Sequence, residues 1–360
     1  MTKINDLPTP TVIADSGRVA KNIRAMQAAC DAYGVELRPH VKTHKMVAVG
    51  RLQLEAGARG FTCAKLGEAE AMLPSGVKRI FIAHSLVDPR QAPRLAALAE
   101  RLEELSVAVT SAEQAEALAR LAQLAGLRLR VKMAVDTGLG REGIRSLPEA
   151  QALALQIARS ANLKLRGFYT HEGQLYSASP AEQADQCERV ITRLAAVRDA
   201  IDAELPIWPG CSVSARLMAA SGRVQAVRPG AYVFGDLALT QVSGVMAMTD
   251  AAVHVLATVV DRPEPGLALI DAGSKTLSGD RTPEKVHAVP ADGRDFAVVR
   301  VNEEHGYVRG EGVDSLKVGD RLRLVPAHVC PVINLTDEVT VVAGDDVIDT
   351  WRVEARGCVR

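Results

Sequence analysis

The sequence predicts an α/β protein in which a (β/α)8 TIM-type barrel is followed by a β-rich C-terminal domain. In the first two thirds of the 360 residues, short β-rich runs alternate with Ala-, Leu- and Arg-rich segments of helical spacing. The runs recur at intervals of roughly 25–35 residues, as a (β/α)8 barrel requires. Beyond about Leu239, strand-like runs follow one another between Gly, Pro and Asp turns, with almost no helical pattern.

The predicted barrel covers residues 10–240. Its expected strands are Thr11–Ala14, Val35–Leu37, Arg79–Ala83, Ser106–Thr110, Leu129–Val135 and Leu165–Tyr169, and its expected helices include Ala92–Glu104, Ala112–Ala125 and Pro180–Ile201. A doubly wound sheet shows the same alternation, so the periodicity alone leaves that alternative open. The predicted second domain covers residues 241–360 together with residues 1–9. Its expected strands are His254–Val260, Leu267–Asp271, Phe296–Val301, Arg321–Val325 and Glu338–Val342.

Charge and cysteine content exclude several classes of protein. Lys plus Arg and Asp plus Glu both number 43, so no net field favours nucleic acid or an anionic membrane. Charged residues interrupt the apolar runs well before the roughly 18 residues of a membrane-spanning helix. The six cysteines lie far apart without a CxxC pair, and the chain opens without an apolar signal core. We therefore expect a cytoplasmic protein with reduced thiols.

The stretch RPHVKTHK (residues 38–45) gathers two histidines and two lysines where a predicted strand ends. The Lys42 amine can form an imine with an aldehyde, and burial beside His40, His44 and Lys45 would lower its pKa from the usual value near 10.4. Lys45 is the rival nucleophile, although it has the opposite strand parity or already lies in the loop. A solvated strand end is the plainer interpretation of this stretch.

A glycine-rich segment, GLGREG (Gly138–Gly143), fits the spacing of a dinucleotide-binding loop but not its context. The next helix is predicted to start only at the SLPE segment of residues 146–149, and no acidic residue ends a strand about 20 positions later. We therefore reject a Rossmann site. Asp136 and Arg141 remain at the carboxyl end of a strand, where barrel enzymes hold their chemistry.

Two small-residue turns follow late in the barrel region: PGCSVS (residues 209–214) and RPGAY (residues 228–232). Backbone N–H groups at such turns suit a phosphate, and late barrel loops often hold one. Each turn alone is most simply just a turn. Together with an imine-forming lysine, they suggest pyridoxal phosphate.

A third cluster is His328-Val329-Cys330 within PAHVCPVINL, just after a predicted strand. In extended chain, residues two apart point the same way, so an imidazole and a thiolate would form two of the ligands that zinc prefers. A bare H-x-C more often means a core cysteine beside an incidental histidine.

These segments resemble the fold-type III pyridoxal-phosphate enzymes, which have an alanine-racemase-like barrel. More closely, the chain resembles the metal-activated D-serine dehydratase / D-threonine aldolase family. The resemblance runs nearly end to end, in the order LPTPTVIAD, RPHVKTHK, CAKLGEAEAM, VDTGLGREG, FYTHEGQLY, VRPGAYVFGD, DAGSKTLS, EEHG and PAHVCPVINL.

The resemblance implies a role for each matching residue. Lys42 would be the Schiff-base lysine, Arg141 would lie near the phenolic oxygen of the cofactor, and His171 would lie against its ring. The phosphate would be held by Ser214, Gly230 and Tyr232. Arg228 matches the racemase arginine that faces the pyridine nitrogen, a position at which relatives vary. His328 and Cys330 would bind a divalent metal, Zn²⁺ before Mn²⁺ or Mg²⁺.

The resemblance also ranks the reactions. Aldolases of the group tend to carry H-C-D where this chain has H-V-C, and a tyrosine where His171 stands. We therefore expect a D-serine dehydratase-type elimination from a small-molecule β-hydroxy D-amino acid, giving a 2-oxo acid and ammonia. A D-threonine aldolase-type cleavage to glycine and an aldehyde is the alternative. A racemase, with Tyr307 as a conceivable second base, and a non-catalytic pyridoxal-phosphate carrier fit less well. The resemblance further implies a homodimer.

Overall fold

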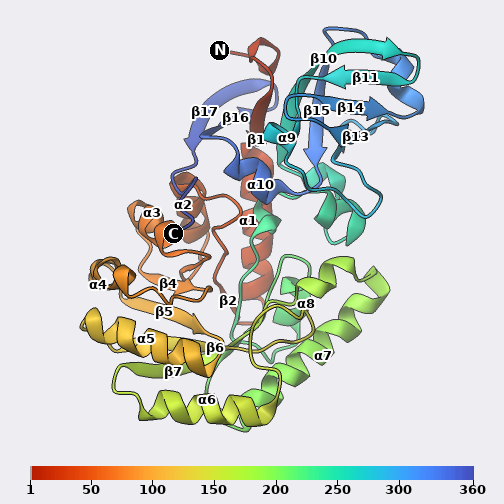
Figure 1. Cartoon of the computed structure of the whole chain (residues 1–360). Helices are drawn as coiled ribbons and strands as arrows, with labels where there is room; N and C mark the ends of the chain where they lie inside the picture. Colours follow the sequence, from red (N-terminus) through yellow and green to blue (C-terminus); the bar gives the residue numbers. More distant parts are fainter. Residues whose placement is uncertain (1) are drawn as a thin grey trace. The chain divides into compact units, whose positions relative to one another are not determined.

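The computed structural model describes residues 2–360 and divides into two compact units (Figure 1). The first, here called the β unit, contains the chain up to Arg24, then Thr43–Ala48 and Ala231–Gly357. The second, the barrel unit, contains Ala25–Lys42, Val49–Gly230 and Cys358–Arg360. No helix in the described part of the chain is long and apolar enough to cross a membrane.

Eight parallel strands form the barrel unit, which confirms the TIM-type prediction. Strands β3 to β8 pair in chain order, and β2 pairs with β9. Backbone hydrogen bonds close the ring, because Arg59 N–H donates to Leu37 O beside β2 and Gln225 N–H donates to Ile207 O in β8. The strands are β2 (Glu36–Leu37), β3 (Phe61–Cys63), β4 (Arg79–Ile82), β5 (Glu104–Val109), β6 (Leu129–Ala134), β7 (Leu163–Tyr169), β8 (Ile207–Trp208) and β9 (Ala226–Val227).

Helices connect these strands, and their starts follow ordinary capping chemistry. The Ser111 hydroxyl accepts from Gln114 N–H, and Ser146 forms a reciprocal capping box with Glu149, as the SLPE segment predicts. The helix predicted over Ala92–Glu104 ends at Glu100, because Glu104 already begins β5. The helices are α1 (Ser16–Asp31), α2 (Val47–Glu55), α3 (Leu66–Met72), α4 (Ala92–Glu100), α5 (Ala112–Leu124), α6 (Leu147–Arg159), α7 (Pro180–Asp199) and α8 (Ala215–Ala220).

Aromatic side chains fill the interior of the barrel unit. Phe81 packs edge-on against Tyr169 and Trp208, with ring centroids 4.9 and 5.9 Å apart. Ala108 and Ala134 complete the cluster from β5 and β6. All these residues are buried, so the barrel is a packed core rather than a channel.

A nine-stranded sheet forms the β unit, in the order β11-β14-β13-β12-β15-β10-β1-β16-β17. Because β10 also pairs with β11, six antiparallel strands close into a small barrel. The strands are β1 (Thr11–Asp15), β10 (Val253–Glu264), β11 (Leu267–Ile270), β12 (Ala288–Pro290), β13 (Ala297–Val301), β14 (Gly306–Arg309), β15 (Arg321–Pro326), β16 (Glu338–Ala343) and β17 (Asp346–Arg352). Two short helices, α9 (Ser274–Leu277) and α10 (Val329–Asn334), belong to the same unit.

The first predicted strand, Thr11–Ala14, forms β1 but lies in this sheet instead of the (β/α)8 barrel. It runs antiparallel to β10 and parallel to β16. Ile4 and Ile13 are each 1% exposed and belong to one apolar cluster with Leu256 and Val342. Burial of these side chains is the physical reason for the placement.

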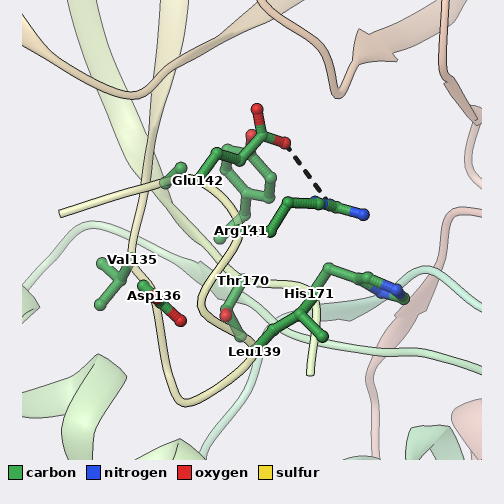
Figure 2. A pocket seen from close by; sticks show the side chains of 9 residues that line it. Val135, Asp136, Leu139, Arg141, Glu142, Thr170 and His171 are labelled. Carbon is green, nitrogen blue, oxygen red and sulfur yellow. Dashed lines mark hydrogen bonds and ion pairs between the residues drawn. The ribbon is translucent and has the colours of Figure 1, made fainter. Parts of the chain in front are cut away.

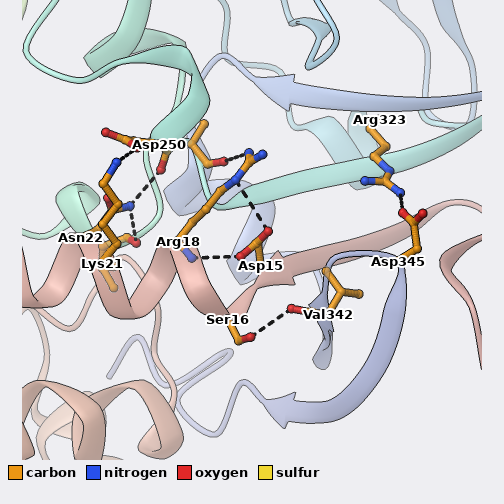
Figure 3. Close-up of polar contacts among 11 residues, drawn as sticks. Asp15, Ser16, Arg18, Lys21, Asn22, Asp250, Arg323, Val342 and Asp345 are labelled. Atoms are coloured by element: carbon orange, nitrogen blue, oxygen red, sulfur yellow. Dashed lines mark hydrogen bonds and ion pairs between the residues drawn. The ribbon is translucent and has the colours of Figure 1, made fainter. Parts of the chain in front are cut away.

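Polar contacts hold the β1–α1 junction in the β unit (Figure 3). The Asp15 carboxylate accepts from Arg18 N–H at 2.9 Å, and the Arg18 guanidinium donates to Ala251 O at 2.8 Å. The Asn22 amide donates to Asp250 O at 2.9 Å. Each bond joins the start of the chain to a segment more than 200 positions later, or caps α1 beside it.

One glycine tests how closely the barrel strands approach. Gly167 in β7 has φ +138°, and a Cβ there would lie 2.7 Å from Pro206 O. We predict that Gly167→Ala lowers the free energy of unfolding by about 2–4 kcal/mol, because both the backbone conformation and the contact are strained. Gly126→Ala is the control, since φ is +67° there but nothing lies within 4 Å; its cost should be about 1–2 kcal/mol. Equal losses in urea melts of the two variants would contradict this account.

Candidate active site in the barrel unit and candidate metal pair

Four predicted residues lie at the carboxyl ends of barrel strands. Lys42 follows β2 in a turn, Arg141 lies in the loop after β6, His171 follows β7, and Arg228 follows β9. The carboxyl ends of a parallel barrel meet on one face, which is where barrel enzymes place their chemistry. The fold therefore brings these residues, distant in the sequence, to one end of the barrel unit.

A small pocket opens between the loops after β6 and β7 (Figure 2). The side chains of Arg141 and His171 extend to the same side of this pocket, and Arg141 forms an ion pair with Glu142 at 3.4 Å. Below them, the Asp136 carboxylate accepts from Gly138 N–H at 3.0 Å and from Gly140 N–H at 3.1 Å. The glycine-rich loop is thus shaped by its own aspartate.

The histidines at this face are held neutral. Burial lowers the pKa of His40 well below its usual value, and Lys42, Arg228, His171 and Arg141 add to the effect. Burial likewise lowers the pKa of His171 to about 3, with the same three cations adding to it. Both imidazoles are therefore neutral near pH 7, where each can accept a hydrogen bond but resists taking up a proton.

Arg228 is 4% exposed and bonds only to carbonyl oxygens and ring faces among its described contacts. Its Nε donates to Trp208 O at 3.2 Å, and its terminal nitrogen donates to Thr170 O. The guanidinium carbon lies 5.0 Å from the ring centroid of Tyr169. These contacts fix the guanidinium in place at the ends of β7 and β8.

The two predicted phosphate turns are joined by a residue that sequence reasoning missed. Ser212 accepts through its hydroxyl from Gly230 N–H at 3.2 Å, so one turn contacts the other. Tyr232 follows as a buried residue of the β unit. The only sequence signal for Ser212 was its place inside a small-residue turn.

Ser214 has a different partner from the one expected of a phosphate-binding residue. Its hydroxyl donates to the carboxylate of Glu172, which is fully buried. The same carboxylate accepts from Gly210 N–H at 3.0 Å and from Cys211 N–H at 2.8 Å. Glu172 thus occupies an anion site made of two backbone donors and one hydroxyl. Sequence reasoning missed it, because a single glutamate after His171 carries no signal of burial.

Lys45, the rival nucleophile, forms a hydrogen bond with a side chain of the β unit. It is 6% exposed, has φ +56°, and donates from Nζ to Asn334 Oδ1 at 2.8 Å within the β unit. Lys42 is the better candidate for covalent chemistry.

The predicted metal pair lies at the start of α10 in the β unit. The expectation that His328 and Cys330 share extended chain is wrong, because helix α10 begins at Val329 and His328 is its N-cap residue. The two side chains nevertheless meet. Burial lowers the pKa of His328, but a hydrogen bond with Cys330, the charges of Cys330 and Asp236, and a bond to Asp280 together raise it to about 10.

Two carboxylates that the sequence did not indicate surround this pair. Asp280 accepts from His328 Nδ1 at 2.7 Å, which leaves Nε2 as the available ring nitrogen. Asp236, which is 1% exposed, accepts from Val329 N–H at 3.0 Å and so satisfies the first turn of α10. Cys330 Sγ lies 3.2 Å from the hydroxyl of Thr43, the residue after Lys42 in the chain. Residues 2–360 contain no preformed group of three or more His, Cys, Asp or Glu that could hold a metal.

A (β/α)8 barrel with a lysine, a histidine and two arginines at the carboxyl ends of its strands is typical of a class of barrel enzymes. The comparison with family models places the chain in such a class. Residues 14–238 match the family described as "Alanine racemase, N-terminal domain", and residues 252–342 match the "Putative serine dehydratase domain". The chain belongs to the alanine racemase N-terminal domain family, in the branch that carries a serine dehydratase domain.

Named relatives that match nearly the whole chain are aldolases and dehydratases. D-threonine aldolase of an Arthrobacter species is 33% identical, over 98% of this chain and 93% of that one. D-threo-3-hydroxyaspartate dehydratase of Delftia sp. (strain HT23) is also 33% identical, over 96% and 97% of the two chains. The crystal structure of D-threonine aldolase from Filomicrobium marinum superposes with a TM-score of 0.90 at 29% identity, covering 99% of this chain and 97% of that chain. The chain is therefore an enzyme of this lyase group.

Variant structures of the Delftia dehydratase bear on the metal pair. One carries a histidine-to-alanine change, and another, described as metal-free, carries a cysteine-to-alanine change two positions further on. Both are 31% identical to this chain, cover 98% of it, and have TM-scores of 0.88 and 0.87.

Replacing Glu172 tests the turn that it holds. Glu172→Ala removes the carboxylate that three buried donors share and leaves Gly210 N–H without its acceptor, so we predict a loss of about 3–5 kcal/mol in the free energy of unfolding. Glu172→Gln keeps one acceptor and should lose less. Glu182→Ala, which removes an exposed capping carboxylate beside Ser179, is the control and should lose about 1 kcal/mol or less. Urea melts measure all three, and a loss for Glu172→Ala no larger than the control would contradict the assignment.

His171 gives a prediction on acid stability. Its pKa is about 3 in the folded chain and near 6.5 when unfolded, so between these values the unfolded chain binds the extra proton. Stability therefore falls as pH drops below about 6.5, by about 2 kcal/mol between pH 7 and pH 5 for this one group. The His171→Gln variant should lack this contribution, so its free energy of unfolding should fall by about 2 kcal/mol less than that of the parent between pH 7 and pH 5. Urea melts of dialysed, cofactor-free protein at the two pH values measure the difference.

Proposed function

We propose that the chain is a pyridoxal-phosphate- and divalent-metal-dependent lyase that eliminates water from a β-hydroxy D-amino acid, releasing a 2-oxo acid and ammonia. The observation that carries the choice of elimination is the His328–Cys330 pair. The Delftia dehydratase places a histidine and a cysteine at the same spacing, and its cysteine variant is described as metal-free. D-serine is the first candidate substrate, followed by 3-hydroxy-D-aspartate and D-threonine.

The residues of the barrel unit fit a phosphate-bearing aldehyde. Lys42, Arg141 and Arg228 all act on His40, and no carboxylate is among the charges that shift the pKa of this histidine. The hydroxyl of Tyr169, buried at the same face, has no hydrogen-bond partner. Only Arg141 of these three cations forms an ion pair among the described residues, with Glu142. The charges of Lys42 and Arg228, together with a buried hydroxyl that has no partner among residues 2–360, suit an anionic ligand with further acceptor atoms.

Each predicted cofactor residue has a distinct task in this proposal. Lys42 would hold the aldehyde carbon, Arg141 the phenolic oxygen and His171 one face of the ring. Arg228, fixed by two carbonyl oxygens, would face the ring nitrogen. Gly230, Ser214 and Tyr232 would border the phosphate, with Glu172 fixing the shape of the Ser214 turn. When bound, the cofactor supplies a conjugated ring that stabilises negative charge at the substrate Cα.

The residues of the β unit suit a divalent metal ion that prefers nitrogen and sulfur ligands. His328 Nε2 and Cys330 Sγ would be the protein ligands, with Asp280 orienting the imidazole through Nδ1. Two protein donors leave coordination positions for water and the substrate hydroxyl. A Lewis acid there supplies stabilisation of the leaving hydroxide, which is otherwise a poor leaving group.

Proton transfer would fall to side chains of the barrel unit. The amine of Lys42 would take the proton from Cα of the bound substrate, because no carboxylate contacts it among its described contacts, whereas the lowered pKa values of His40 and His171 make those imidazoles weaker bases. His171, neutral throughout the physiological range, would accept a hydrogen bond from the substrate. In the elimination the hydroxide leaves from Cβ and the product hydrolyses to the 2-oxo acid and ammonia.

The same site also suits retro-aldol cleavage, which is the second candidate function. D-threonine aldolases of Arthrobacter and Filomicrobium are 33% and 29% identical to this chain. In that reaction a base takes the hydroxyl proton instead of the Cα proton, and the metal lowers the pKa of that hydroxyl. The thiolate donor Cys330 in place of a carboxylate favours the elimination.

We also propose that the enzyme is a cytoplasmic homodimer. All six cysteines are free, which suits a reducing compartment. Light scattering of the eluted protein at about twice the chain mass of 38.4 kDa would support the dimer.

Product analysis tests the reaction. We predict that D-serine and 3-hydroxy-D-aspartate yield ammonia and a 2-oxo acid, whereas L-serine yields neither. Glycine plus an aldehyde from D-threonine, without ammonia, would establish the aldolase instead. Borohydride treatment of the holoenzyme followed by peptide mass analysis should find the cofactor on Lys42; a label on Lys45, or none, would sink the proposal.

Metal removal separates the metal-dependent lyases from a racemase or a cofactor carrier. We predict that EDTA and Cys330→Ala each lower kcat by at least about 100-fold, because the leaving hydroxide loses its Lewis acid. The visible absorbance of the bound cofactor should remain. Cys187→Ala, which replaces a buried cysteine of α7, is the control and should keep activity. Unchanged activity after both treatments would refute a catalytic metal.

A further inference from the structure

A second cavity opens in the barrel unit, at the end of the barrel opposite to Lys42 and His171. Its lining includes Glu36 and Glu104, the first residues of β2 and β5, and Pro206, the residue before β8. Its volume is about 700 Å³, which lies within the range of small-molecule sites. The amino-terminal face of a barrel ordinarily serves stability, so a cavity of this size there calls for an explanation.

Two buried donors in the lining have no hydrogen-bond partner. Arg38 is 2% exposed and pairs through Nη2 with Glu36 at 2.8 Å, but its Nη1 lies 3.6 Å from the nearest Glu104 oxygen and makes no hydrogen bond. Ser106 is 1% exposed, and its hydroxyl also makes none. Buried polar groups are nearly always satisfied, so these two indicate a missing acceptor.

A buried lysine lies beside them. Lys132 is 3% exposed, donates from Nζ to Arg166 O at 3.1 Å, and has that nitrogen 3.5 Å from the ring centroid of Trp208. Arg38 lies 4.8 Å from the same ring. No carboxylate bonds to Lys132 among its described contacts, so the indole face and a carbonyl are its direct partners, and the carboxylates of Glu104 and Glu36 act on it only from a distance.

The side chains around the cavity carry more positive than negative charge. The cations in the lining are Arg38, Arg130, Lys132 and Arg166, and the acids are Glu36, Glu104 and Glu204. Glu104 is shared, with Arg38 at 3.6 Å and Arg130 at 3.7 Å. One positive charge therefore remains without a matching carboxylate, next to two unpaired donors.

We propose that this cavity binds a small carboxylate, at a site separate from the catalytic face. One oxygen of the carboxylate accepts from Arg38 Nη1, the guanidinium nitrogen that is not bonded to Glu36. Its second oxygen accepts from the hydroxyl of Ser106, and its charge balances Lys132. The ligand supplies the acceptors and the negative charge that the lining lacks.

The ammonium of Lys132 makes the site sensitive to pH. Burial lowers the pKa of Lys132 to about 7, with Glu104 and Glu36 opposing and Arg38 and Arg228 adding to the shift. A bound anion stabilises the charged ammonium, so binding takes up a proton near neutrality. The affinity therefore falls as pH rises from 6 to 8.5.

Calorimetric titration of the holoenzyme with succinate tests the proposal, with neutral succinamide as the matched ligand control. We expect succinate to bind and succinamide not to bind. Lys132→Met should weaken succinate at least about tenfold, because a charge-assisted contact is lost. Ser106→Ala should weaken it about three- to fivefold, and it removes a hydroxyl without a partner, so the fold is retained. Lys164→Met, an exposed lysine of β7, is the control and should bind like the parent.

Succinate bound at the catalytic face would be displaced by substrate and would not respond to Ser106→Ala. That result, or no binding, or equal affinity for succinamide, overturns the proposal. Both variants should keep the kcat of the parent, because neither residue lies at the catalytic face.

Discussion

Closure of eight parallel strands is the constraint on which the functional face depends. The barrel closes where β2 lies between β9 and β3, and only then do the loops after β2, β6, β7 and β9 share one end. Lys42, Arg141, His171 and Arg228 each follow a different strand. Their effect on His171 arises from this geometry and from burial, since none of Lys42, Arg141 and Arg228 is near it in the sequence.

Lys42 and Arg141 could be predicted from the residues because they stand at strand ends, which alternating periodicity indicates. His171, and the cofactor roles of Arg141 and Arg228, were expected only because the chain resembles a known family. The parts that could not be predicted depend on tertiary burial. Glu172 and Ser212 are ordinary polar residues in the sequence, and only packing shows that the first is a buried anion and the second links two turns. The contact between Asp280 and His328 could not be predicted for another reason, because the two residues lie 48 positions apart in the sequence.

Local chemistry misled the prediction at two places. His328 and Cys330 do not share an extended segment, because Asp236 accepts the first N–H of α10 and so favours a helix there. Their side chains meet all the same, since a cap residue and the second helical residue can face one another. The strand Thr11–Ala14 was predicted correctly as a strand, but the local sequence does not indicate to which of the two sheets it belongs. The burial of Ile13 against Leu256 decides this.

The pairing of β1 with β16 places Ile13 opposite Thr340, so the beginning and the end of the polypeptide occupy neighbouring positions in one sheet. During synthesis β1 leaves the ribosome before every strand of the barrel unit, and β16 leaves it after all of them. The β unit can therefore complete its sheet only after β16 has been made, when the strands of the barrel unit are already available. A truncated product that stops before residue 338 would expose an apolar edge along β1, which makes incomplete chains natural targets for chaperones and proteases.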